Sequence, residues 1–528
     1  MTWTDIYTFH KFGEVILRNF GYLVSIKKDF VIYDEKLQAI ALKAAAERKG
    51  MKSFDAAASV GVIEYMKSEY GSIRKAAEAL RESDKENLGE LLEIYETIIH
   101  ENNAVDFSDL LCVPLEIIRK NPSLKRVFQN MYEHVLVDEC QDTNHVQLML
   151  LRSLFENSAV RIFGVADEDQ SIYTWRGARI KNLKDFLEAF EADLRDLRRN
   201  YRCHPSILKV ADSLILKSTS RMKTGELIAC RRDDGECRAR RVDVSDVEAE
   251  GQFIADKIAD SMGNHIRKWS DVTVLGRNWT HLKSAAQALS EANIAYVIIN
   301  EADIPDTPEV NVLLAALRSC ANPHDGLGRD LVTQLLLEAE HPYPQSYDPA
   351  KFLKQTQNPL DLLRILRKSL NLNALLDDKE PDEQERRLKA MNDFEAYCRT
   401  VFATAPDLSS FSRTLTLEGH SDQAKEEDQE NAVRLMTMHT SKGTENKVIF
   451  IVALDEEIFP RFDIKPNTDR WEEERRLLYV SITRAEDHLY LLHCETRPTA
   501  RGFLRDRNPS PLLLEIDHNL LSCMNYPE

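Results

Sequence analysis

Short apolar runs that end in acidic residues recur along the chain and predict buried strands of a parallel sheet. Residues 135–137 are aliphatic and lead directly into Asp138 and Glu139, and residues 161–166 lead into Asp167 in the same way. Continuous apolar runs of this kind are typical of strands that are covered on both faces. We therefore expect a buried central strand at residues 135–137 whose carboxyl end carries acidic side chains.

The alternation of strands and helices continues further along the chain. Residues 271–277 and 295–299 predict strands on either side of a helix over residues 281–292. Apolar strands return at residues 448–452 and 488–492, after a long helix-rich region. The predicted fold class is therefore α/β with a parallel sheet.

Two long blocks interrupt this alternation and predict helical insertions. Residues 35–101 are rich in Ala, Lys, Glu and Leu, and residues 307–429 are mostly helical and highly charged. The acidic runs in the second block are expected to be solvated helix faces. After the first block, Asp106 or Ser108 is placed to cap the following helix. The opening residues 6–10 predict the end of a strand, followed by a helix with one apolar face.

The composition is that of a globular protein too long for one core. A chain of 528 residues is expected to form three or four domains. It has no membrane-spanning run, no signal-peptide pattern and no C-x-x-C pair among its scattered cysteines, which favours a reducing cytoplasm. The net charge of −18 argues against nucleic acid, but basic residues cluster at 195–202 and 238–241, so the net charge decides little.

The two acids after the first predicted strand have a functional and a structural interpretation. An Asp at a strand end can hold the Mg²⁺ of a bound nucleotide, and the adjacent Glu can polarise an attacking water. The simpler interpretation is an apolar strand that ends in an acidic loop. The longer string DECQDTN, which contains Asp138 and Glu139, favours the functional interpretation.

A second informative stretch reads ADEDQSIYTWRGA. Gln170 can sense a terminal phosphate because its amide both donates and accepts hydrogen bonds. Tyr173 and Trp175 offer stacking faces for unpaired bases, with Arg176 adjacent. The alternative is a turn that carries a core tryptophan, but the polar residues directly before it favour nucleic-acid binding.

Arginines provide the third set of candidates. A dense basic and aromatic cluster ends in Tyr201 and Arg202, and a predicted helix near the C-terminus ends at Arg484. An arginine at that position can project across a domain cleft and neutralise charge on a transferring phosphoryl group. The alternative is a surface salt bridge of Arg484 with Glu473 or Glu474.

Taken together, these stretches resemble the UvrD/Rep family of superfamily 1 DNA helicases. Five motifs occur in the family's order across nearly the whole chain: DECQDTN, ADEDQSIYTWRGA, NYR, MTMHTSKGTE and EERRLLYVSITRA. The resemblance implies two RecA-like motor domains, each with a mainly helical insertion. It also implies ATP-dependent movement from 3′ to 5′ on single-stranded DNA.

The resemblance further implies roles for the residues at matching positions. Asp138 would bind Mg²⁺ and Glu139 would activate water. The residues at the nucleotide would be Gln170, Arg202 and Arg484 on the γ-phosphate, Tyr201 on the adenine and Glu445 on the ribose. The single-strand track would be lined by Thr8, His10, Tyr173, Trp175, Arg176 and His439. The implied cofactors are ATP and Mg²⁺, and the implied partner is single-stranded DNA.

The implied domain boundaries follow the two helical blocks. The first motor domain is expected at residues 1–10 and 133–197, incomplete at its N-terminus, with its helical insertion at residues 11–132. The second motor domain is expected at residues 198–306 and 430–528. Its helical insertion is expected at residues 307–429.

The sequence departs from the family in one respect. It contains no G-x-x-x-x-G-K string followed by Ser or Thr, the loop whose amides and lysine hold the phosphates. We therefore expect a helicase that lacks its N-terminal segment in this sequence and has little ATPase activity by itself. The alternatives are a catalytically inactive pseudo-helicase that binds DNA or acts as a scaffold, and a helicase subunit of a nuclease. Protein partners from DNA repair, a nuclease or anti-phage defence are compatible with each.

Overall fold

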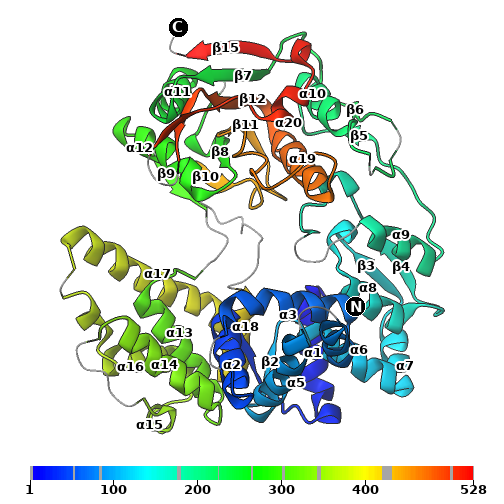
Figure 1. Cartoon of the computed structure of the whole chain (residues 1–528), viewed down its shortest axis with the longest axis vertical. Helices are drawn as coiled ribbons and strands as arrows, with labels where there is room; N and C mark the ends of the chain where they lie inside the picture. The colour runs from blue at the N-terminus through cyan, green and yellow to red at the C-terminus, as the bar shows by residue number, and fades with distance from the viewer. Residues whose placement is uncertain are drawn as a thin grey trace.

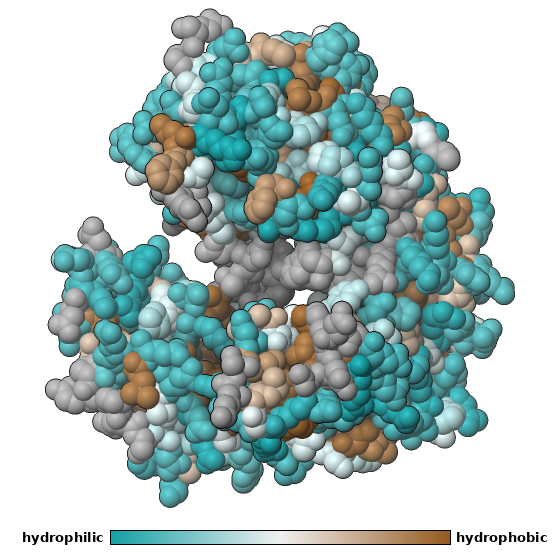
Figure 2. All heavy atoms as spheres, viewed as in Figure 1, coloured by the Kyte–Doolittle hydropathy of each residue, from teal (hydrophilic) through white to brown (hydrophobic). Residues whose placement is uncertain are grey.

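The computed structural model describes the chain apart from short gaps. The described residues are 4–51, 54–82, 86–174, 180–219, 221–223, 225–262, 266–299, 304–341, 347–377, 379–418, 431–499 and 503–526. A sheet with flanking helices lies at one end of the molecule and a mainly helical mass at the other (Figure 1). The visible face is mostly hydrophilic and is hollowed between these two ends (Figure 2). Within the described ranges, no helix is both long enough and apolar enough to cross a membrane.

The largest sheet has seven parallel strands in the order β15-β7-β12-β11-β8-β10-β9. All five residues of its inner strand β8 are buried, as expected for a strand covered on both faces. The predicted α/β fold with a parallel sheet is confirmed. The strands are β7 (Ala239–Val244), β8 (Val272–Gly276), β9 (Tyr296–Ile298), β10 (Val433–Thr437), β11 (Asn446–Ile451), β12 (Ala485–Cys494) and β15 (Ser522–Tyr526).

Helices cover both faces of this sheet because its apolar side chains alternate between two cores. Ile449 and Leu489 belong to the core formed with α10 (Pro205–Ile215), α19 (Asp469–Ile482) and α20 (Pro511–Glu515). Phe450 and Tyr490 belong to the core formed with α11 (Val247–Ser261) and α12 (Lys283–Glu291). Two small sheets lie beside it, β5 (Arg199–Asn200) with β6 (Ile228–Ala229) and β13 (Thr496–Pro498) with β14 (Leu504–Asp506).

The strand that precedes Asp138 is not a buried central strand. Among the described residues, β3 (His134–Val137) pairs only with β4 (Arg161–Gly164), in parallel. Val137 packs into a core with α6 (Asp109–Lys120), α7 (Pro122–Met131), α8 (His145–Phe155) and α9 (Ile180–Ala189). The register partners Leu136 and Phe163 are 74% and 61% exposed. The prediction of burial is wrong at Leu136, although Val137 is buried, because the described chain packs against only one face of this strand pair.

The first described helix begins within residues 6–10, which were predicted to end a strand. Residues 4–8 form no strand, and α1 (Phe9–Phe20) follows them. The Thr8 hydroxyl accepts a hydrogen bond from the Lys11 amide at 3.2 Å and caps this helix, which a strand end would not do. The predicted apolar face of the helix is confirmed, since Ile16 and Leu17 are fully buried.

The first helical block is confirmed as four helices and a short parallel strand pair. The helices are α2 (Glu35–Arg48), α3 (Ala56–Tyr70), α4 (Ile73–Arg81) and α5 (Glu86–Glu101), and the strands are β1 (Val31–Tyr33) and β2 (Ala104–Asp106). Of the two predicted caps for α6, Asp106 performs this role, because its Oδ1 accepts from the Asp109 amide at 2.8 Å. The Ser108 side chain makes no capping hydrogen bond.

The second helical block packs against the first in a shared hydrophobic core (Figure 1). Its helices are α13 (Pro308–Ala321), α14 (Gly326–Glu338), α15 (Pro349–Leu353), α16 (Pro359–Ser369), α17 (Pro381–Thr404) and α18 (Leu408–Glu418). The buried Tyr33 hydroxyl donates to Asp325 Oδ1 at 2.6 Å across this contact. Arg413, which is 1% exposed, donates to Glu14 at 2.8 Å. The two blocks therefore form one packed unit, while the four domain boundaries inferred from sequence stay a prediction.

Candidate active site

Asp138 and Glu139 follow β3 directly and are exposed at the carboxyl end of the strand. The Glu139 backbone is left-handed, with a φ of 47°, which is uncommon for a residue with a side chain and concentrates at turns and functional sites. The Glu139 amide donates to Asp138 Oδ1 at 3.0 Å. The other carboxylate oxygen of Asp138 can serve as the hard ligand that Mg²⁺ prefers. The residues present therefore fit a Mg²⁺ site.

Gln141, which is fully buried, joins the two acidic strand ends. Its Nε2 donates to Glu139 Oε2, and its Oε1 accepts from the Asp167 amide at 2.9 Å. Gln170 donates in turn from its own Nε2 to Asp167 Oδ2 at 2.7 Å. One hydrogen-bonded line therefore connects Glu139 with Gln170, two residues that the sequence motifs place at a nucleotide.

Basic residues from a later segment hold the acids that follow β4. Arg221 donates two hydrogen bonds to Asp169, at 2.9 and 2.8 Å, and Lys223 donates to Asp167. Burial acts to lower the pKa of Lys223, but the nearby acids Asp167, Asp169 and Glu168 together outweigh it, so this pKa lies above its ordinary value. These carboxylates are neutralised by partners within the chain, which distinguishes them from the exposed Asp138.

The segment after β4 is attached to the large sheet domain by two basic side chains. Lys442 donates to the carbonyl oxygen of Gln170 at 2.8 Å and also binds the Asp142 carboxylate. Arg476 donates to the carbonyl oxygen of Ser171 at 2.6 Å. Both cations lie in regions matched to sequence motifs of the second half. The structure therefore brings motifs from the two halves of the chain into direct contact.

Two predicted DNA-binding residues lie together at this contact. The ring centroids of Tyr173 and His439 are 6.5 Å apart, and Lys442 Nζ lies 5.0 Å from the centroid of the Tyr173 ring. Aromatic faces beside a cation can stack on a base and neutralise the neighbouring phosphate. This arrangement is suited to an unpaired nucleic-acid strand.

The other predicted DNA-binding residues are placed elsewhere or are not described. Thr8 caps α1, and the His10 ring lies edge-on to the Phe107 ring, with centroids 6.2 Å apart. Trp175 and Arg176 lie outside the described residues, so their predicted role stays a prediction.

Three of the predicted nucleotide residues cluster on the second half. Arg202 donates from Nε to Glu445 Oε2 at 2.5 Å. Tyr201, next to Arg202 in the chain, is 70% exposed, so its ring is available for stacking. The cluster combines an aromatic face, a carboxylate and a guanidinium group, which are the chemical groups needed to bind a base, a ribose and a phosphate.

Arg484 is buried and does not project into solvent. It is 2% exposed and donates to the carbonyl oxygens of Val480 at 2.9 Å and Thr444 at 3.0 Å. Burial and, secondly, the charge of Arg202 lower its pKa to about 10, while Glu139 is among the groups that act in the opposite direction. Arg484 thus fixes the loop after β10 and lies within electrostatic reach of Glu139.

The alternative surface salt bridge of Arg484 is not found. Glu473 accepts a hydrogen bond from the Thr174 amide at 3.0 Å, and Glu474 pairs with Arg277 at 2.9 Å. Both glutamates are therefore engaged by other residues, and Arg484 is bound by the backbone instead.

Two family models match the chain. The UvrD/REP helicase N-terminal domain matches residues 1–191, and the UvrD-like helicase C-terminal domain matches residues 196–338 and 347–496. The chain belongs to the UvrD/Rep helicase family. Membership of this family supports ATP-dependent DNA helicase function.

Curated relatives of this UvrD/Rep helicase agree with the family models. The ATP-dependent DNA helicase PcrA of Staphylococcus epidermidis is 27% identical over 562 residues, which cover 97% of this chain and 76% of the relative. The protein of the same name from Staphylococcus aureus is 28% identical over 565 residues, with the same coverage. The similarity therefore extends over both halves of the chain.

Several residues that organise the site of this UvrD/Rep helicase were not singled out from the sequence. Gln141 and Lys442 stand inside the motifs DECQDTN and MTMHTSKGTE, so a signal for them existed. Arg221 and Lys223 lie in a segment with no recognisable motif. Their pairing with acids more than 50 positions earlier depends on the tertiary fold and could not be read from local sequence.

Proposed function

We propose that this chain is an ATP-dependent helicase or translocase that moves from 3′ to 5′ on single-stranded DNA, with ATP and Mg²⁺ as cofactors. The observation that carries the proposal is the contact between Lys442 and Gln170. It joins a residue proposed to sense the terminal phosphate to the aromatic pair Tyr173 and His439, proposed to hold DNA. Nucleotide binding and DNA binding can therefore be coupled through the short segment that contains Gln170 and Tyr173.

In this proposal the nucleotide residues divide into two groups. Bound Mg²⁺ would neutralise charge on the phosphates, and Asp138 would hold it. Glu139 would orient and deprotonate the attacking water. The residues proposed to contact the nucleotide are Gln170, Arg202 and Arg484 at the γ-phosphate, Tyr201 at the adenine and Glu445 at the ribose. Arg484 would reach its target only after a change in the loop that it now holds, because its donors are engaged by carbonyl groups.

The proposed DNA track runs past both halves of the chain. Tyr173 and His439 would stack with bases, and Lys442 would hold the segment of Tyr173 in place through Asp142 and Gln170. Thr8 and His10 would extend the track along the first half, and Trp175 and Arg176 complete the proposed set. We further propose a cytoplasmic location, since all nine cysteines are free thiols.

We propose low ATPase activity for this chain by itself. The printed sequence contains no glycine-rich phosphate-binding loop, and without its amide cradle the phosphates lose a large part of their binding energy. A second candidate function is a DNA-binding or scaffolding subunit, within DNA repair, a nuclease or anti-phage defence. The exposed apolar pair Leu136 and Phe163 favours this candidate, because such a surface is suited to a protein partner.

The test measures ATP hydrolysis and DNA binding on the same protein. A fluorescent single strand should bind in anisotropy titrations, more tightly than duplex, and ATP turnover should be low with or without DNA. Tyr173→Ala should weaken DNA binding, whereas Tyr70→Ala, on the first helical block, should not. Turnover at ordinary helicase rates that is abolished by Glu139→Gln, but not by the nearby Glu133→Gln, would contradict the proposed low activity. Failure to bind single-stranded DNA would contradict the helicase and the DNA-binding subunit and leave only the scaffolding role.

A further inference from the structure

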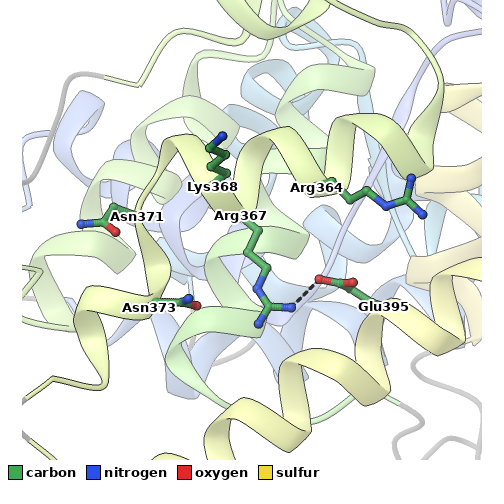
Figure 3. Close-up of a pocket in the computed structure, with 6 residues that line it drawn as sticks. All are labelled: Arg364, Arg367, Lys368, Asn371, Asn373 and Glu395. Carbon is green, nitrogen blue, oxygen red and sulfur yellow. Dashed lines mark hydrogen bonds and ion pairs between the residues drawn. The ribbon is translucent and has the colours of Figure 1, made fainter.

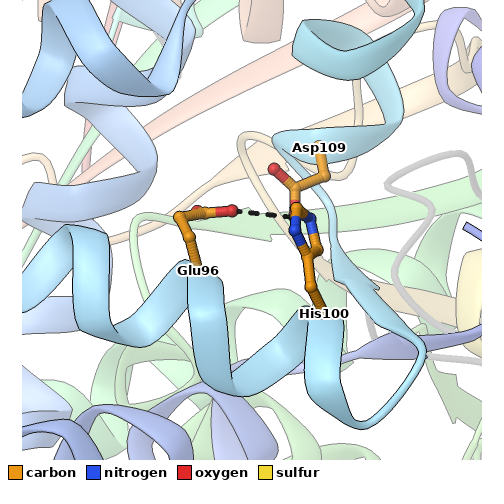
Figure 4. Close-up of side chains that lie close together, drawn as sticks. All are labelled: Glu96, His100 and Asp109. Carbon is orange, nitrogen blue, oxygen red and sulfur yellow. Dashed lines mark ion pairs between the residues drawn. The ribbon is translucent and has the colours of Figure 1, made fainter. Parts of the chain in front are cut away.

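A cluster of potential metal ligands lies between the first helical block and the helix that leads to β3. Glu96 and His100 are one turn apart on α5, and Asp109 is the first residue of α6. One ligand atom from each residue lies within 4.8 Å of the other two. The Glu96 carboxylate points toward the His100 ring, with Asp109 beside that ring (Figure 4). The spacing of four residues puts two ligands on one face of a helix, as in helical metal sites.

The charges around this cluster are not balanced. Lys67 is fully buried, and its Nζ lies 2.6 Å from Glu96 Oε1, 2.6 Å from Asp106 Oδ2 and 2.5 Å from Asp109 Oδ1. Three buried carboxylates therefore surround one ammonium group. With all three ionised, two negative charges are in excess, and burial raises the pKa of both Glu96 and Asp109. Buried charge of one sign is costly unless it is compensated. A divalent cation would supply the charge that is missing.

One carboxylate oxygen at the cluster also lacks a partner. Glu96 is 6% exposed, and its Oε2 accepts no hydrogen bond, although its Oε1 is bound to Lys67. The distance from this oxygen to His100 Nε2 is 3.9 Å, which is beyond hydrogen-bond distance. An unsatisfied buried carboxylate oxygen costs about 1–3 kcal/mol or more. The oxygen is therefore available on the side that faces the imidazole.

We propose that Glu96, His100 and Asp109 bind one divalent transition-metal ion of the zinc type. An imidazole nitrogen and two carboxylate oxygens are a known kind of ligand set for zinc, and water can fill a fourth, tetrahedral position. Tetrahedral ligands at about 2 Å from the metal lie about 3.4 Å from one another, so shifts of about 1 Å would close the site. The His100 side chain is 41% exposed, which gives the ion a path from solvent.

The bound ion would connect two parts of the fold. α5 belongs to the first helical block, whereas α6 continues through α7 to β3 and the proposed catalytic acids. The metal would fix the junction between them, while Lys67 would still hold the other oxygen of Glu96. The predicted role is structural, so the ion should raise the melting temperature of the protein by binding the folded state alone.

Cobalt(II) is the probe for the test, because its visible spectrum reports its ligands. The full chain is treated with a chelator, dialysed, and titrated with Co²⁺. The proposal expects about one ion per chain with nitrogen and oxygen ligands and a higher melting temperature. His100→Ala should weaken binding at least about tenfold. The control His324→Ala removes an exposed histidine on the second helical block and should leave binding unchanged.

Two further comparisons keep the result unambiguous. His204, Asp233 and Asp234 form another group of possible ligands, so Asp233→Asn is measured in parallel and should retain the site at His100. Glu96→Gln should also weaken Co²⁺ binding. If this variant unfolds, the His100→Ala variant alone tests the proposal, because His100 is exposed. Equal binding by wild type and His100→Ala, or a spectrum with only thiolate charge transfer, would overturn the proposal. Neither outcome would affect the proposed helicase function.

Discussion

Arg202 Nε lies 2.5 Å from Glu445 Oε2, so two residues proposed to bind different parts of a nucleotide are paired with each other. The pair joins the segment after β5 to the loop between β10 and β11. Both side chains remain partly open to solvent, 34% and 54% exposed. The pairing therefore keeps the guanidinium group near its proposed target without burying it.

The exposure of this pair predicts a small role in stability. Glu445→Gln should change the free energy of unfolding by less than about 1 kcal/mol, because solvent screens exposed ion pairs. Chemical denaturation of the variant measures this value, with Arg202→Gln as the reciprocal variant. A loss of several kcal/mol in either would show that the pair is part of the structural core.

Arg484, unlike the exposed pair of Arg202 and Glu445, should contribute strongly to stability. Arg484→Met should destabilise the protein by about 2–4 kcal/mol, because it removes the charged donor from the buried carbonyl group of Val480 and the part-buried carbonyl group of Thr444. Arg470→Met is the matched control on α19, since the Arg470 side chain is 57% exposed. Equal denaturation midpoints for the two variants would contradict the structural role of Arg484.

The contact of Lys442 with Gln170 should restrain the segment that carries Tyr173. Lys442→Ala should increase amide hydrogen exchange in that segment by about 5–30-fold, the equivalent of about 1–2 kcal/mol. Lys447→Ala provides the control, because Lys447 pairs with Asp271 within the large sheet domain. Unchanged exchange in the Lys442 variant would mean that other contacts suffice to hold the segment.

His281 should make stability sensitive to acid. Burial, with Arg497 as the next cause, lowers its pKa to about 4. The unfolded chain takes up this proton below a pH of about 6.5, whereas the folded protein resists it until about 4. Stability from this group is therefore complete above about 6.5 and is lost as the pH falls toward 4. His281→Leu should show a smaller drop in melting temperature between about pH 7 and pH 5 than wild type.

An exposed histidine serves as the control for that comparison. His324→Leu removes an exposed histidine side chain and should keep the wild-type pH dependence. If the melting temperature of His281→Leu depends on pH as that of wild type does, the acid sensitivity does not come from His281.

The apolar pair on β3 and β4 should promote self-association. Leu136→Ser should lower the light scattering of concentrated protein, because Leu136 is 74% exposed beside Phe163 on an uncovered sheet face. Leu504→Ser removes a leucine that is 75% exposed on another strand and controls for exposure alone. Equal scattering by the two variants would show that the strand pair has no special part in association.

Local sequence was sufficient to predict several inner elements of the large sheet, although β7, β15, α10 and α11 were not predicted. Residues 271–277 were expected to form a strand, and β8 occupies Val272–Gly276, because continuous burial leaves a continuous apolar run. The helical blocks were equally readable from composition. Two of the motifs contain Glu139 and Gln170, which one hydrogen-bonded line connects, although the motifs did not indicate that Arg484 is buried.

Burial and long-range pairing could not be predicted in the same way. Residues 135–137 have the composition of a buried strand, yet Leu136 is exposed because burial depends on which elements pack nearby. The hydrogen bond between Tyr33 and Asp325 joins residues 292 positions apart and leaves no local pattern. The roles of individual site residues stay predictions for the same reason, since each depends on a bound nucleotide or strand.

The shared core of the two helical blocks limits how the protein can be engineered. Deleting either block alone would uncover apolar side chains of the other and leave Asp325 or Tyr33 without its partner. The blocks therefore form a single structural unit, although they are two separate segments of the sequence. An engineered variant therefore has to keep or remove both blocks together, and a substitution of Asp325 should be accompanied by a compensating change at Tyr33.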